Sequence, residues 1–194
     1  MPATTTKIGI INRGLQVLGQ PSIGSINENS RGAKSMLRAY DSVLLAELRS
    51  NTWKFAIKRA SIAASAFPPI FGKPHAYPLP GDFLYLAPDE INYHLAKNRD
   101  WEIEGLQIIT SDPTPLEVRY VSSNITESTF DALFAEALAY SLALATSEEL
   151  TNSNSKLQNI SGLYDQVIKR ARKRNSIESA PVKPPVPSWI SVRQ

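Results

Sequence analysis

The segment AFPPIFGKPHAYPLPGDFLYLAP, residues 66–88, decides the fold because it separates two stretches of helical pattern. It holds six of the fourteen prolines of the chain, and a proline inside a helix removes a hydrogen-bond donor and clashes with the preceding turn. No helix can persist across it. Short alternating apolar runs with turn residues between them are typical of antiparallel strands. They are Phe83–Leu86, Ile91–Leu95, Trp101–Ile103, Leu106–Ile109 and Leu116–Val121. We expect a small antiparallel sheet of four or five strands within residues 66–123.

Helical periodicity lies on both sides of this sheet. Apolar residues three and four apart predict helices over about 5–18, 30–51, 128–149 and 153–174. From Trp53 the pattern changes, and both a last helical turn and the start of a strand fit Trp53, Phe55 and Ile57. The fold class is therefore α+β. Residues 1–65 and 124–178 form a bundle of about four helices, and the sheet domain, residues 66–123, is inserted between helices two and three.

The remaining residues, 179–194, are expected to form an extended C-terminal arm. Four prolines between Pro181 and Pro187 make a stiff spacer. Apolar residues follow it, and leaving them in water at a chain end costs free energy. Either the arm docks into a neighbouring subunit or partner, or it folds back on its own domain. We favour docking, with Trp189, Ile190 and Val192 as partner-interface residues.

Composition argues against an enzyme. The chain has no cysteine and two histidines, His75 and His94, so sulfur-based metal sites and a Ser-His-Asp triad have little support. Glu102 and Glu104 resemble a two-carboxylate hydrolase pair, but they flank Ile103 as the solvated side of an ordinary strand does. We expect no catalytic residues, no metal and no cofactor. The longest nearly apolar run, about nine residues, is half of what a bilayer span needs.

Charge is segregated along the sequence. Lys and Arg outnumber Asp and Glu by ten to three in residues 1–81 and by eight to two in residues 151–194, whereas residues 82–150 hold three against thirteen. The densest basic group closes the fourth helix: Lys169, Arg170, Arg172, Lys173 and Arg174. These side chains either contact phosphates without sequence selectivity or complement the dipole of a solvated helix end. Tyr164, the aromatic residue nearby, belongs to the apolar stripe, which disfavours stacking on single strands.

Small residues mark the third helix. Ala132, Ala135, Ala139 and Ala143 recur at spacings of three and four, which lets another helix approach closely. Ala139 is our candidate for a contact between subunits. Packing within the chain is the alternative.

Several stretches together resemble the tail tubular protein A family of short-tailed bacteriophages. They are INRGLQVLG over Ile11–Gly19, PSIGSI over Pro21–Ile26, WKFA over Trp53–Ala56 and YPLPGDFL over Tyr77–Leu84. An Ala-rich helix from Phe130, the stretch Gln158–Tyr164 and the pair Ala171-Arg172 recur in similar order. The resemblance covers about residues 8–174.

The resemblance implies a structural virion protein, the head-to-tail connector or adaptor. Such a protein assembles as a ring, expected to be a dodecamer, between the portal protein and the tail nozzle protein, and genome DNA passes through its lumen. It implies assembly in the host cytoplasm, location in the virion tail, no membrane partner and no catalytic residues. The alternative is a monomeric, non-specific nucleic-acid-binding module that uses the basic end of the fourth helix.

Overall fold

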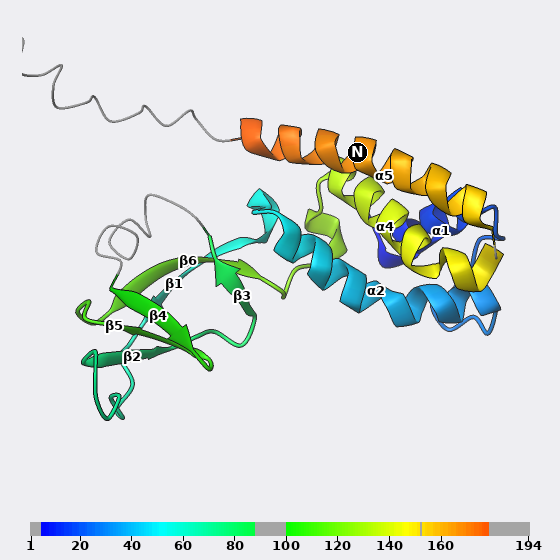
Figure 1. Ribbon diagram of the computed structural model, residues 1–194. Coiled ribbons are helices and arrows are strands. Elements are labelled where there is room, and N and C mark those ends of the chain that lie inside the picture. Colours follow the sequence, from blue (N-terminus) through cyan, green and yellow to red (C-terminus); the bar gives the residue numbers. More distant parts are fainter. Residues whose placement is uncertain (1–4, 88–99, 152, 179–194) are drawn as a thin grey trace, which may run out of the picture.

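The computed structural model describes residues 5–87, 100–151 and 153–178, and it shows an α+β fold (Figure 1). Its long helices are α1 (Lys7–Leu18), α2 (Arg31–Ser50), α4 (Ala132–Thr151) and α5 (Asn154–Ile177). Side-chain caps begin three of them: Thr6, Ser30 and Ser153 each accept a hydrogen bond from a backbone N–H of the first turn. The four predicted helices are confirmed.

Helix α4 is the centre of the helical part. α1, α2 and α5 each pack on it, while α1 and α2 contact each other less, for example through the ion pair Lys7–Asp41. Its buried residues therefore surround the whole helix rather than one face. α1 crosses it closely at Gly14, where a Cβ atom would lie 3.0 Å from the carbonyl oxygen of Ala139 and 3.3 Å from Met36. Only glycine fits this crossing without a shift of the backbone.

The strands form two sheets of three rather than a single sheet of four or five. β1 (Ile57–Ile62), β6 (Leu116–Ser122) and β3 (Phe83–Leu86) pair antiparallel in the order β1-β6-β3. β2 (His75–Pro78), β5 (Gln107–Thr110) and β4 (Trp101–Glu104) pair antiparallel in the order β2-β5-β4. The predicted strand Ile91–Leu95 lies outside the described residues.

Two sheets arise because their apolar faces cover each other. Tyr77 and Ile108 of the second sheet share a buried cluster with residues of the first, which are Ile62, Leu116, Val118 and Tyr120. One open sheet would have left this face in water. The ambiguity after Trp53 is resolved as well, because a single 3₁₀ turn, Lys54–Ala56, leads directly into β1. The strand region thus begins at Ile57 and includes residues that we had placed with the helices.

An aromatic cluster joins the two parts. The ring of Phe134 on α4 lies 4.8 Å from those of Trp53 and Phe55 and 5.1 Å from that of Phe130, between centroids. Val121 of β6 is also buried in the core of the helical part. The first sheet is therefore packed onto the helices at this junction, and it carries the second sheet.

Candidate functional site

The five predicted basic residues at the end of α5 are all exposed. Lys169, Arg170, Arg172, Lys173 and Arg174 surround Ala171, which is buried and faces the core. The guanidinium of Arg172 donates to Ser50 Oγ at 3.4 Å. Within the described part of the chain, none of the five forms an ion pair with a carboxylate. Their charge is therefore available to an external anion.

Asn175 fixes this end of α5 to the junction. Its Nδ2 donates to the carbonyl oxygen of Thr52 at 2.7 Å, and its Oδ1 accepts from the backbone N–H of Lys54 at 2.8 Å. Both groups of one amide are thus bonded to the segment between α2 and β1. The basic helix end therefore has a defined position relative to the sheets.

Two contacts of α5 bring in two basic residues that the sequence had not indicated. The backbone N–H of Lys54 bonds to Asn175, and the Lys54 side chain is half-buried. Arg49 lies one residue before Ser50, the partner of Arg172. Arg49 is exposed and donates to the carbonyl oxygen of Leu84 at 2.9 Å. No linear pattern could have joined them to α5, since Lys54 and Asn175 are 121 positions apart. We call the five residues with Arg49 and Lys54 the basic surface.

A buried carboxylate lies beneath the basic surface. Glu47 is 5% exposed, and its Oε1 accepts from the hydroxyl of Tyr164 at 2.6 Å. Burial, and then this hydrogen bond, raise the pKa of Tyr164 above its ordinary value. Tyr164 packs against the core as predicted, so its ring is not presented to a nucleic-acid base.

A second basic group, on the first turns of α2, is neutralised locally. Arg31 and Arg38 both donate to Glu149, to its backbone carbonyl and its carboxylate respectively, and Ser35 Oγ donates to the same carboxylate at 2.7 Å. Ser35 first, and then the arginines, hold the pKa of Glu149 below its ordinary value. This group therefore offers an external anion less free charge than the basic surface does.

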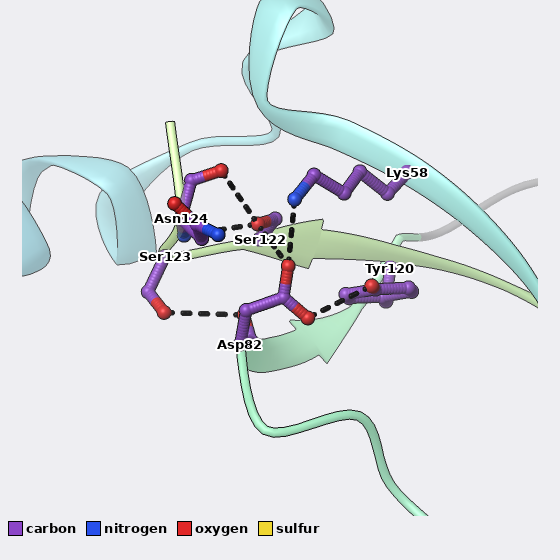
Figure 2. A network of polar contacts seen from close by, with 6 residues as sticks. All are labelled: Lys58, Asp82, Tyr120, Ser122, Ser123 and Asn124. Carbon is purple, nitrogen blue, oxygen red and sulfur yellow. Dashed lines mark hydrogen bonds and ion pairs between the residues drawn. The ribbon is translucent and has the colours of Figure 1, made fainter. Parts of the chain in front are cut away.

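Asp82 organises the first sheet (Figure 2). Its Oδ2 accepts from Lys58 Nζ and from Ser122 Oγ, both at 2.7 Å, and its Oδ1 accepts from the hydroxyl of Tyr120 at 2.9 Å. Lys58 lies on β1, Tyr120 and Ser122 lie on β6, and Asp82 directly precedes β3. One carboxylate therefore connects all three strands of the sheet.

The donors around Asp82 decide its chemistry. Lys58 first, and then Ser122 and Tyr120, lower the pKa of the Asp82 carboxyl to about 2. Burial, and then the hydrogen bond to Asp82, raise the pKa of Tyr120 to about 12. A carboxylate with so low a pKa is a poor proton acceptor near neutrality. The network is structural, and we assign no catalysis to it.

The residues of the run Ile11–Gly19 also have structural roles. Asn12 bonds both backbone groups of Ile23, at 2.8 and 3.0 Å, and Arg13 forms a salt bridge with Glu136 of α4 at 2.6 Å. Gly19 ends α1 with φ of 67°, a conformation that favours glycine. The run therefore specifies how α1 packs and how it ends.

The remaining candidates give no sign of a reaction centre. Glu102 and Glu104 are exposed on β4, and Glu102 pairs with Lys73 at 2.8 Å. His75 is half-buried on β2, and His94 lies outside the described residues. In the residues described, no three His, Cys, Asp or Glu side chains gather as metal ligands. Nor does any helix of this part have the length and hydropathy to cross a membrane.

The candidate interface residues fall in two places. Ala139 is fully buried between α4 and α1, so its small size serves packing within the chain and it offers no surface to a partner. Trp189, Ile190 and Val192 lie outside the described residues.

Comparisons with known proteins add no relative. No protein-family model and no curated protein matches this sequence. A function therefore has to be argued from the surfaces above and from the resemblance of the sequence to tail tubular proteins.

Proposed function

We propose that this chain is a head-to-tail connector of a short-tailed bacteriophage, a structural protein that assembles as a ring between portal and nozzle. The observation that carries the proposal is where the resembling stretches lie. Gly14 and Gly19 shape α1, Trp53 and Phe55 build the aromatic junction, and Asp82 holds the first sheet. The resemblance is thus concentrated at the positions that specify this two-part architecture.

The basic surface fits a wall along which DNA passes. Unpaired Lys and Arg side chains attract phosphates without reading bases. Such contact has to be weak in a connector, because the genome slides through the lumen and tight binding would stall it. Among the described residues, Tyr164 packs against the core and offers no aromatic platform beside these charges, which is in keeping with this role.

Assembly with the portal tests the proposal. Electron microscopy of the purified protein mixed with portal and nozzle proteins should show closed rings bound to the portal. Removal of residues 180–194 should weaken assembly and leave the melting temperature of the helical part nearly unchanged. A chain that stays monomeric with both partners would contradict the connector.

The unpaired basic surface also favours a second candidate, a monomeric DNA-binding module. The two differ in affinity for free duplex DNA. For a connector we expect binding that is undetectable, or that falls steeply with salt and ignores sequence. Replacing the five basic residues of α5 by Gln should abolish what binding remains and spare the fold. Sequence-selective binding that survives moderate salt would favour the module.

A further inference from the structure

The loop between β1 and β2 presents three large apolar side chains to solvent. Phe67, Ile70 and Phe71 are 86%, 100% and 88% exposed. We call these three residues the apolar tip. Scattered exposed apolar residues are ordinary, but three within five positions form a cluster, and such clusters mark interaction sites.

The loop that carries the apolar tip is held at its base. The backbone N–H of Ser65 donates to the carbonyl oxygen of Ala76 at 2.7 Å, and that of Ala64 donates to Thr114 Oγ1 at 3.2 Å. On the other side Lys73 Nζ lies 2.8 Å from Glu102 and 3.8 Å from Asp100. Pro68-Pro69 further stiffens the loop within these supports. A partner would therefore lose little loop entropy on covering the tip.

We infer that the apolar tip of one copy receives the C-terminal arm of a neighbouring copy, with Trp189, Ile190 and Val192 packed on Phe67, Ile70 and Phe71. This inference rests on the ring of the proposed function. Both sides are apolar, and mutual burial of such side chains drives association. The charges are complementary as well, because the arm carries Lys183 and Arg193. Three carboxylates, Asp100, Glu102 and Glu104, lie on and beside β4, and Lys73 offsets one of their charges.

The position at which the arm starts favours binding of the arm to the tip of a neighbouring copy over binding to the tip of its own chain. The arm follows α5, whose end is fixed at Thr52 and Lys54 by Asn175. Trp189 comes eleven residues after Glu178, and a proline-rich segment spans about 3.1 Å per residue, or roughly 34 Å here. In Figure 1 both sheets lie between the end of α5 and the loop of the tip. The chain's own arm would have to pass around them, while a neighbour's arm can approach the tip from outside.

Engineered disulfides test the contact directly, because the chain has no cysteine of its own. One preparation carries Ile70→Cys and another Val192→Cys, and the two are mixed, assembled into rings on the portal and oxidised. We expect a disulfide-linked dimer that contains one chain of each kind. The matched control replaces Ile70→Cys by Leu106→Cys, since Leu106 is another exposed apolar residue, 79% exposed, on the turn between β4 and β5. This control should give at least about tenfold less dimer.

The outcomes separate this inference from the connector itself. Rings that form without the disulfide, or with equal yield from the Leu106→Cys control, overturn the inference and leave the connector standing. A bond from Ile70→Cys to a cysteine of the portal or nozzle would assign the tip to that protein instead. A double variant, Ile70→Cys with Val192→Cys, that closes the bond within one chain would also overturn it. If no rings form, the connector and the inference fail together.

Variants of both surfaces give a second measurement. Phe67→Ser with Phe71→Ser should raise the concentration needed for ring assembly about tenfold or more, as should Trp189→Ser with Ile190→Ser. If tip and arm meet, the four changes together should cost no more than either pair alone. Melting temperatures should stay unchanged, because the tip is exposed. Additive losses would overturn the contact.

Discussion

The helical part and the sheet part of this chain reach stability in different ways. The helices enclose one large core, to which α4 contributes buried residues from every side of its middle turns. The sheets share a small buried cluster and depend in addition on one ionised carboxylate, Asp82, that joins three strands. Substitutions that change the size of a buried side chain should therefore destabilise the helical part most. Changes of charge or pH should destabilise the sheet part most.

The largest effect is expected from Phe134→Ala. Phe134 is fully buried and contacts Trp53, Phe55 and Phe130, so its removal leaves a cavity at the junction of both parts. The free energy of unfolding, measured in urea, should fall by about 3–5 kcal/mol. Phe71→Ala is the matched control, because the same side chain at 88% exposure should change it by less than about 0.5 kcal/mol. Equal losses at the two sites would contradict a core centred on α4.

Ala139→Leu should cost somewhat less, about 1–3 kcal/mol, because the added atoms have to displace α1 at its crossing with α4. Ala145 lies exposed on the same helix, so Ala145→Leu should leave the free energy of unfolding nearly unchanged. Thermal melting of the two variants makes the comparison. An unchanged melting temperature for Ala139→Leu, combined with failed assembly, would return this residue to a subunit interface.

Asp82→Asn tests the sheet part, with an expected loss of about 1–2 kcal/mol near neutral pH. The pKa of the folded carboxyl is about 2 and its ordinary value is 3.8, so its contribution is complete above about pH 5 and is lost as the pH falls through 2. The variant should therefore lose less stability than the parent between pH 4 and pH 2. Asp41→Asn, whose carboxylate pairs with Lys7 but is 81% exposed, serves as the control. If the free energy of unfolding of Asp82→Asn and that of the parent fell by the same amount between pH 4 and pH 2, the structural role of this network would be contradicted.

The smallest effect is expected at the end of α5. Arg174→Gln removes a cation from the last turn and should cost at most about 0.3–1 kcal/mol, with less effect in high salt. Urea unfolding at low and high salt measures this. A loss above about 2 kcal/mol would mean that Arg174 supports the fold rather than lying free on its surface.

Local pattern was enough to predict most of the elements. Prolines exclude helices over residues 66–88, and periodicity places the four helices because both signals come from neighbours in sequence. The pairing of the strands could not be predicted from local pattern, because β1 pairs with β6 across about 60 positions and tertiary packing sets this partner.

The candidate site shows the same limit. The sequence indicated the five basic residues of α5 because they lie within six positions of one another. It missed Lys54 and Arg49 because only the contacts of Asn175 with Lys54 and of Arg172 with Ser50 place these residues beside α5. It offered Ala139 as a subunit contact because small residues look alike whether they face a helix of the same chain or of another. The close approach of Gly14 decides between the two.

The position of α4 has a consequence for synthesis on the ribosome. α1 and α2 pack more on α4 than on each other, yet α2 ends at Ser50 and α4 extends over Ala132–Thr151. Translation of the roughly 80–100 residues between them takes about 4–20 s at common rates. Throughout that interval the nascent chain carries two amphipathic helices with uncovered apolar faces. All described strands of both sheets have been synthesised once Ser122 is added, so the sheets can fold first. When α4 emerges, it covers the apolar faces of α1 and α2 and completes the helical core.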